Sequence, residues 1–346
     1  MLYILMTALT ALVIVWVLGP LLIPLLARLN LIRPGREDVP EPPPQPTRKK
    51  QAAPPKPKLP APTMGGVLVL LAVVTATLIF GLEGMEFALP ALVATLALGV
   101  LGFADDFIRL RDPDGIGLRA EVLLGAELVV AVIVAVWAYR SPLIGPVLRL
   151  PISGRDWDIG GWYIPLVIVL MMLEINAAHL SDGMDGLVSG VSAMYALAMI
   201  AILSALAAVA NQNGELLQGD NLAGGASFAA AVAGAGIGFL RYNTYPARIQ
   251  AGSSGSLAFG GAVAMMAVLG RSLIVLPLMS FCLLASIGSV ALQALSKLRR
   301  NGKGLFRAVP VHRHFELTGH PASQIAAMYT MLTAVICAFC LLPYFR

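Results

Sequence analysis

Long apolar runs alternate with short polar segments along most of the chain. Ten of the runs approach the length of about 20 residues that an α-helix needs to cross a bilayer. They cover residues 2–26, 64–80, 87–104, 122–138, 162–179, 187–210, 223–240, 256–269, 272–295 and 325–342. A strand of a transmembrane barrel would alternate apolar and polar residues, whereas these runs suit helices that satisfy their own backbone in lipid. The pattern therefore predicts an all-α polytopic membrane protein with about ten transmembrane helices.

The composition agrees with this interpretation and excludes a soluble domain. Hydrophobic residues make up 58% of the 346 positions and charged residues only 12%, against about 25% charged residues in soluble domains. The three cysteines, Cys282, Cys337 and Cys340, lie in apolar runs without metal-ligand spacing and are typical of small core residues. We expect residues 1–346 to form a single integral membrane domain.

The basic residues indicate how the helices are oriented. Most of the 24 lysine and arginine residues fall in alternate inter-helix loops, beginning with the first. Because cytoplasmic loops are enriched in these residues, the odd-numbered loops are expected in the cytoplasm and both termini on the periplasmic side. The first of these loops, residues 30–62, is rich in proline and lysine and is predicted to be extended rather than packed. The net charge of +5 matters through this distribution, so nucleic acid is not implied as a partner.

The first polar cluster is the pair Asp105 and Asp106, at the cytoplasmic end of the third run. Adjacent carboxylates can hold Mg²⁺, a hard cation that takes oxygen ligands and bridges to phosphates. One of the two could also act as a base, since a neighbouring like charge raises the pKa of a carboxyl group. The alternative is a solvated helix end that contains an ordinary Asp/Arg pair.

The second cluster, residues 176–186, places two carboxylates, an imidazole and an amide between two apolar runs. Asp182 and Asp185 are three residues apart and share a face if the backbone is helical. Gly183 and Gly186 favour a tight turn whose backbone N–H groups can approach phosphate. Acidic groups at the mouth of a membrane helix favour a functional role, although Asp182 could instead cap the following helix.

Two further clusters lie in later odd-numbered loops. Residues 252–256 form a glycine/serine turn before the eighth run, a position suited to anion binding and equally to an ordinary helix start. Residues 310–316 contain His312, Arg313 and His314. Histidine can transfer protons near neutral pH and arginine can hold phosphate, while an ordinary basic interfacial loop is the alternative. Since all four clusters are expected on the cytoplasmic side, they predict one site that meets a soluble phosphorylated donor and a lipid acceptor.

Several ordered motifs give the chain a resemblance to a known family. They are residues 62–66 (Pro-Thr-Met-Gly-Gly), Asp105 with Asp106, residues 176–186, Asn243 with Pro246 and Ala247, residues 252–261 and residues 310–319. From about Lys58 to the C-terminus the chain resembles the phospho-N-acetylmuramoyl-pentapeptide transferase (MraY) family, within the polyprenyl-phosphate N-acetylhexosamine-1-phosphate transferases. The resemblance implies transfer of phospho-MurNAc-pentapeptide from UDP to undecaprenyl phosphate, with Mg²⁺, giving lipid I and UMP at the bacterial inner membrane. It also implies a homodimer.

The resemblance implies roles for individual residues, each carried over by its place in a motif. Asp105, Asp106 and His312 would be catalytic. The residues that match substrate-binding positions are Lys58, Asn176, His179, Asp182, Asp185, Gln250 and His314. The residues expected to support the metal ion are Asp105, Asp106, Asp182 and Asp185.

Five positions depart from the usual motifs of the family. Ser253 stands where the family has the aspartate expected to ligate Mg²⁺, and a neutral hydroxyl is a poorer ligand for a hard dication. Gln250 replaces an aromatic residue expected beside uracil, and His179 replaces an asparagine. Arg109 replaces a lysine and Arg313 replaces the middle of three histidines; arginine and lysine hold phosphate with different geometry.

These departures leave more than one function open. We expect a membrane glycosyl-1-phosphate transferase whose Mg²⁺ is held by aspartates together with the diphosphate. The alternatives are a catalytically impaired paralogue that binds lipid or partner proteins, and a related transferase for another UDP-sugar. A transporter is disfavoured because its polar groups should lie near the membrane midplane, whereas these are expected at one surface.

Overall fold

Helices form nearly all of the regular structure in this computed structural model, which describes residues 2–29, 31–32, 61–112, 115–151, 153–300 and 302–345. They are α1 (Leu2–Arg28), α2 (Gly66–Phe80), α3 (Met85–Arg111), α4 (Ala120–Arg140), α5 (Tyr163–Ser181), α6 (Leu187–Gln212), α7 (Leu216–Asn243), α8 (Gly252–Leu269), α9 (Leu276–Met279), α10 (Phe281–Arg299), α11 (Val311–Leu317) and α12 (Ala322–Leu341). Three 3₁₀ turns (Leu82–Gly84, Gly160–Trp162 and Leu342–Phe345) flank longer helices. A small antiparallel hairpin, β1 (Val147–Arg149) with β2 (Asp156–Asp158), lies between α4 and α5.

The helices confirm the predicted fold class. Nine helices of the described chain are long and apolar enough to cross a membrane. The second predicted span forms α2, an apolar helix of 15 residues, which is shorter than the other nine. The hydrophobic pattern thus predicted the helices correctly, while the hairpin between α4 and α5 lies in a polar connection and left no signal in that pattern.

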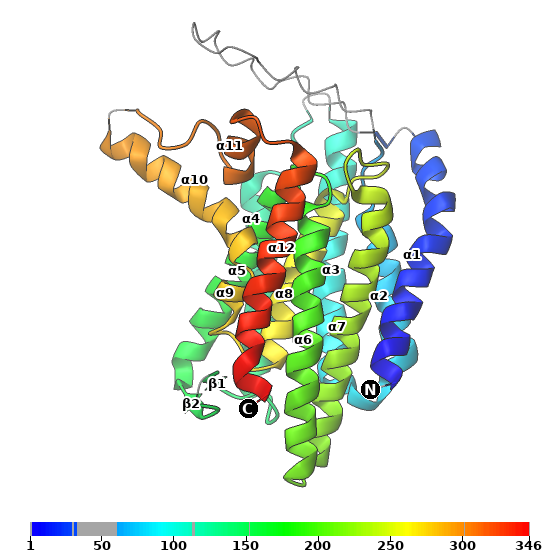
Figure 1. Cartoon of the computed structure of the whole chain (residues 1–346), viewed down its shortest axis with the longest axis vertical. Coiled ribbons are helices and arrows are strands. Elements are labelled where there is room, and N and C mark those ends of the chain that lie inside the picture. Colours follow the sequence, from blue (N-terminus) through cyan, green and yellow to red (C-terminus); the bar gives the residue numbers. More distant parts are fainter. Residues whose placement is uncertain are drawn as a thin grey trace, which may run out of the picture.

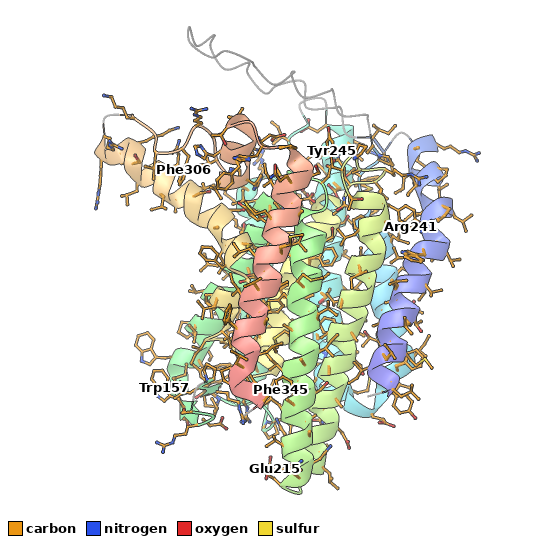
Figure 2. All side chains as sticks on the ribbon, in the orientation of Figure 1. Trp157, Glu215, Arg241, Tyr245, Phe306 and Phe345 are labelled. Atoms are coloured by element: carbon orange, nitrogen blue, oxygen red, sulfur yellow. The ribbon has the colours of Figure 1, made fainter. Side chains whose placement is uncertain are left out.

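The long helices run side by side along the long axis of the molecule (Figure 1). Both termini lie at one end of the bundle, and α11 lies at the other. Trp157, Glu215 and Phe345 mark the end with the termini, whereas Tyr245 and Phe306 lie near the opposite end (Figure 2). The prediction that both termini share a side therefore agrees with the arrangement of the helices; which side faces the cytoplasm stays a prediction from the charge pattern.

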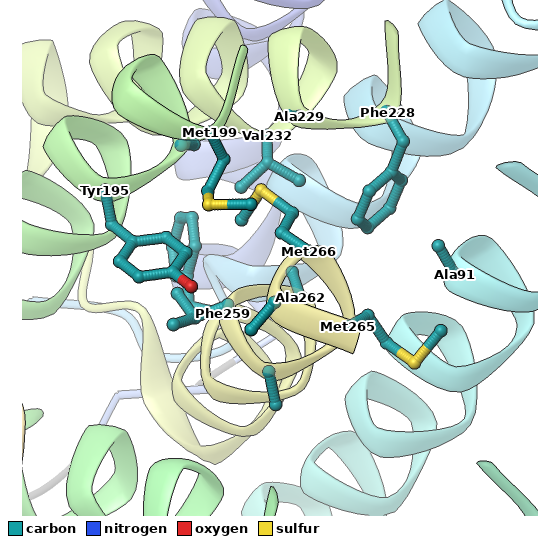
Figure 3. Packing of buried hydrophobic residues seen from close by; sticks show 14 of the residues in the cluster. Ala91, Tyr195, Met199, Phe228, Ala229, Val232, Phe259, Ala262, Met265 and Met266 are labelled. Atoms are coloured by element: carbon teal, nitrogen blue, oxygen red, sulfur yellow. The ribbon is translucent and has the colours of Figure 1, made fainter. Parts of the chain in front are cut away.

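The helix α8 lies in the centre of the bundle and is buried along its whole length. In Figure 3 its side chains, among them Phe259 and Met266, interlock with residues of α6 and α7. Glycines let neighbouring helices reach its first turn. A Cβ at Gly102 of α3 would fall on the backbone of Ser253, and a Cβ at Gly66 of α2 would fall on the backbone nitrogen of Gly255. The packing therefore brings α2, α3 and the start of α8 together at the end opposite the termini.

Two predicted boundaries are wrong. The glycine/serine motif at 252–256 was expected in a loop, but it is the first turn of α8, which begins at Gly252 with a φ of 72°. The ninth predicted span is interrupted at Ser280, which separates α9 from α10. The Ser280 hydroxyl donates to the carbonyl oxygen of Leu276 at 2.8 Å, and such a local bond competes with the regular helix. Beyond the break, α10 leaves the bundle (Figure 1).

Candidate functional site

Asp105 is a buried residue on α3, one to two turns before the helix ends, and its carboxylate accepts three hydrogen bonds. Its Oδ2 accepts hydrogen bonds from Nη2 of Arg109 at 2.8 Å and from the hydroxyl of Ser253 at 2.5 Å. Its Oδ1 accepts from the backbone N–H of Leu118 at 2.9 Å. The predicted Asp/Arg pair therefore exists, but its carboxylate is buried rather than solvated, and it ties α3 to α8.

Asp106 faces the first turn of α8 as well. Its Oδ2 accepts the backbone N–H of Ser254 at 3.1 Å, an arrangement that uses the positive end of a helix to hold an anion. Gly252 must be glycine here, because a Cβ would contact Oδ2 of Asp106 and Oγ1 of Thr63. The aspartate pair, the glycine/serine motif and the Thr-Met-Gly-Gly motif are therefore in contact, although they are far apart in the sequence.

The loop between α5 and α6 is fixed by its neighbours. Oδ1 of Asn243 accepts the backbone N–H of Gly186 at 3.1 Å and the hydroxyl of Ser189 at 2.9 Å, while its Nδ2 donates to the carbonyl of Ile249 at 3.0 Å. Oδ2 of Asp185 accepts the backbone N–H of Ala247 at 3.2 Å. As the sequence predicts, Gly186 makes a tight turn, with a φ of 79°.

Replacing Asn243 by alanine should lower the free energy of unfolding by about 1–3 kcal/mol, because buried hydrogen-bonding groups of three residues lose their partner. Thermal unfolding in detergent micelles measures the change. Asn213→Ala, at the exposed C-terminal end of α6, is the control and should leave the unfolding curve in place. Equal unfolding curves for the two variants would show that the hydrogen bonds of Asn243 do not stabilise the α5–α6 loop.

α5 contributes His179 and Asn176 from its last two turns, so both lie in the helix rather than in the loop that follows. Nδ1 of His179 lies 3.2 Å from the hydroxyl of Ser256 on α8. Asn176, one turn earlier, donates a hydrogen bond from Nδ2 to Oε2 of Glu127 on α4 at 2.7 Å. Both predicted residues therefore contact other polar groups at this end of the bundle.

The cluster at 310–316 forms the short helix α11, and it is divided between two environments. His312 is buried and lies 3.5 Å from the Ser286 hydroxyl through Nδ1. A Cβ at Gly183 would come within 3.5 Å of side-chain nitrogens of both His312 and Arg313, so these two residues meet the α5–α6 loop. His314 instead accepts the backbone N–H of Arg307 at 3.2 Å, and this bond ties it to its own loop.

Of the two remaining predicted residues, the structure describes Gln250 but not Lys58. Gln250 is half-buried, and its backbone pairs with residues 62–65: its N–H donates to Pro62 and its carbonyl accepts from Gly65, both at 2.9 Å. Lys58, predicted to lie near the nucleotide, is outside the described residues. The site therefore contains Gln250 at its edge, and the role of Lys58 stays a prediction.

Sequence reasoning missed one residue that touches the site. Glu127 is fully buried on α4 and contacts Asn176. The available signal was a single carboxylate within the apolar run 122–138, and an ionisable residue in such a run is by itself a hint of function. Its partner was not predictable, since Asn176 lies 49 residues away in the chain.

The described residues contain no group of three His, Cys, Asp or Glu side chains that could hold a metal ion. Asp105 fits poorly as a ligand, because three donors already occupy most of the roughly four lone-pair positions of its carboxylate. Asp106, Asp182 and Asp185 come from two separate segments. Mg²⁺ commonly takes one or two carboxylates and completes its shell with substrate phosphates and water. One or two of these carboxylates could therefore hold Mg²⁺ jointly with a diphosphate, whereas the three do not form a metal site by themselves.

Comparison with known proteins shows which family the chain belongs to. Residues 88–271 match Glycosyl transferase family 4. The chain belongs to this family. The match covers α8 and both aspartate pairs, whereas the Thr-Met-Gly-Gly motif and α11 lie outside it.

Curated relatives extend the similarity to nearly the full length. The chain is 32% identical to the phospho-N-acetylmuramoyl-pentapeptide-transferase of Clostridium novyi (strain NT), over 96% of this chain and 94% of the relative. It is 33% identical to that of Thermoanaerobacter sp. (strain X514), over 92% and 91%. It is 32% identical to that of Syntrophus aciditrophicus (strain SB), over 95% and 89%. The predicted resemblance to the MraY family is confirmed, and this member of glycosyl transferase family 4 is a multi-pass, MraY-like phospho-sugar transferase.

Proposed function

We propose that this chain transfers phospho-MurNAc-pentapeptide from UDP to undecaprenyl phosphate, forming lipid I and releasing UMP at the cytoplasmic face of the bacterial inner membrane. The observation that supports this most is the contact of Asp105 and Asp106 with the first turn of α8. It joins acidic side chains and helix N–H groups where a membrane-embedded acceptor and a soluble donor can meet. The nearly full-length similarity to transferases of that name supports the choice of substrates.

The residues of the chain would act mainly by placing charge. An oxygen of the lipid phosphate attacks the sugar-linked phosphorus of the donor, and the bond from that phosphorus to the oxygen of UMP breaks. Arg313, beside the α5–α6 loop, can hold phosphate oxygens through its planar guanidinium group. His312 can carry a proton in the same place. When bound, Mg²⁺ would supply further neutralisation of the diphosphate, and one or two of Asp106, Asp182 and Asp185 would hold it.

A second candidate function is a catalytically impaired paralogue that keeps the fold to bind lipid or a partner protein. The specific observation in its favour is the 2.5 Å hydrogen bond from Ser253 to Asp105. The hydroxyl at the expected metal-ligand position is turned to a neighbouring carboxylate and brings no negative charge of its own. The remaining alternative is a related transferase for another UDP-sugar. The donor that supports turnover in an assay distinguishes the two.

A UMP-release assay with UDP-MurNAc-pentapeptide and undecaprenyl phosphate tests the proposal across a Mg²⁺ titration. We expect wild-type turnover that depends on Mg²⁺, and a lower Mg²⁺ requirement in Ser253→Asp, since a carboxylate is the better ligand. Ser153→Asp, in the exposed hairpin turn, is the matched control and should behave like wild type. Turnover only in Ser253→Asp would establish the impaired paralogue, and turnover in neither protein would reject this reaction.

A further inference from the structure

Glu127 is a buried glutamate on a helix that mostly faces lipid. It lies about two turns after the start of α4, and its side chain is fully buried. Oε2 accepts the hydrogen bond from Asn176, whereas Oε1 has no hydrogen-bond partner within the described chain. A half-satisfied buried carboxyl group lowers stability. A buried acceptor kept at a cost to stability points to a task in holding Asn176, which a glutamine at this position could also perform.

The contacts of Asn176 fix which end of its amide group faces the site. Nδ2 donates both to Oε2 of Glu127 at 2.7 Å and to the backbone oxygen of Met172 at 2.9 Å. A backbone carbonyl is an acceptor only, so the amide group that faces the Met172 oxygen must be the nitrogen. The amide nitrogen is therefore held on the side of these two oxygens, and Oδ1 points away from them. Asn176 is half-buried, so part of the residue is accessible.

The position of Asn176 places that oxygen beside the polar groups already described. His179 lies one turn further along the same face of α5 and contacts Ser256 on α8. Ser256 shares the first turns of α8 with Ser253, which bonds to Asp105. Three polar contacts therefore link α4 to α5, α5 to α8 and α8 to α3, and Asn176 takes part in the first of them.

We propose that Glu127 is a positioning residue that holds Asn176 with its oxygen toward the site, where it takes an electropositive group of the reaction. A carbonyl-type oxygen binds a hard divalent cation or accepts a hydrogen bond from an O–H or N–H group. It repels phosphate oxygens, which an inverted amide would attract. The inference rests on the proposed function in that it takes the group to be Mg²⁺ or a hydroxyl or amide of the donor sugar.

Three substitutions test the orientation. Asn176→Leu removes the oxygen, and Glu127→Leu removes the acceptor that holds it; each should weaken the affinity for the group about tenfold, the effect of losing one good hydrogen bond. Glu127→Gln can still accept from Asn176 and should rescue affinity to within about threefold of wild type, within the spread of neutral hydrogen bonds. The double variant Glu127→Leu/Asn176→Leu should be no worse than Asn176→Leu alone, because both changes act on one contact.

Calorimetric titrations of the purified protein with Mg²⁺ alone and with UDP-MurNAc-pentapeptide need no turnover. If Asn176→Leu and Glu127→Leu weaken Mg²⁺ binding, the group that the Asn176 oxygen takes is the cation. If they weaken donor binding and leave Mg²⁺ binding unchanged, it is a sugar or peptide group of the donor. Lower thermal stability with both affinities unchanged would overturn the proposal, as would a selective loss of undecaprenyl phosphate binding or a Glu127→Gln variant as weak as Glu127→Leu. If wild type binds no donor, the proposed function fails, while the Mg²⁺ titration still tests the orientation.

Glu174→Gln is the matched control. Glu174 is also a fully buried glutamate, and it lies only two residues from Asn176. Two residues along an α-helix differ by more than half a turn, so Glu174 faces away from the Glu127 contact. Its substitution should leave both affinities unchanged. A loss of affinity in Glu174→Gln as large as that in Glu127→Leu would show that any buried carboxyl change has the effect, and would overturn the specific role of Glu127.

Discussion

Replacing Asp106 by asparagine should reduce UMP release by about a hundredfold to a thousandfold, the usual effect of removing one well-placed charge-stabilising group. Asparagine keeps an oxygen that can accept the Ser254 N–H, at 3.1 Å in the wild type, so the first turn of α8 should stay in place. The substitution removes the negative charge beside the expected diphosphate but not the packing. The thermal unfolding temperature should therefore change little, and the loss should fall on turnover.

The neighbouring aspartate should behave differently, and the contrast makes the prediction specific. Asp105→Asn leaves the guanidinium of Arg109 without its charged partner, and breaking a buried pair of this kind costs about 3 kcal/mol. Its main effect should appear in the unfolding curve. Asp112→Asn, at the half-buried C-cap of the same helix, keeps an oxygen that can accept the Ile116 N–H and is the control for both assays. Equal turnover in Asp106→Asn and Asp112→Asn would remove Asp106 from the reaction.

The sequence predicted the helices because burial in lipid selects long apolar runs, and such runs can be read directly. It also predicted that both termini lie at one end, since charge asymmetry between loops reports alternation. The break at Ser280 was not predicted, because the residues around it are as apolar as a continuous span. The start of α8 at Gly252 was missed for a similar reason: glycine and serine in a loop and in a buried first turn look alike in sequence.

The candidate site shows the same division. The aspartate pairs, the histidines and the glycine/serine motif were recognisable as residue types with chemistry, and contacts join most of them at one end. Their pairing was not recognisable. The bond from Ser253 to Asp105 joins residues 148 positions apart, whereas the resemblance showed only that Ser253 stands in place of an expected metal-ligating aspartate. His314 accepts the backbone N–H of Arg307, whereas His312 lies beside Ser286. The motif alone does not reveal this difference, because it depends on the local fold.

One added methyl group at Gly102 should be strongly destabilising. A Cβ there would overlap the carbonyl group of Ser253 and the nitrogen of Ser254. These are backbone atoms, which cannot rotate away as a side chain can, so α3 and α8 would have to separate. Overpacking of this kind costs about 3 kcal/mol or more, and it would also displace the aspartates from the first turn of α8.

Gly102→Ala should therefore lower the unfolding temperature in detergent and abolish UMP release together. Gly125→Ala on α4 is the matched control, because no atom of a neighbouring group lies within 4 Å of a Cβ at that position. There the exchange should be neutral or stabilise the helix by up to about 1 kcal/mol, since alanine has the lower conformational entropy when unfolded. A Gly102→Ala protein as stable and as active as Gly125→Ala would show that the close approach of α3 to α8 does not hold the site, and the link between packing and chemistry would then rest on the hydrogen bonds of Asp105 and Asp106 alone.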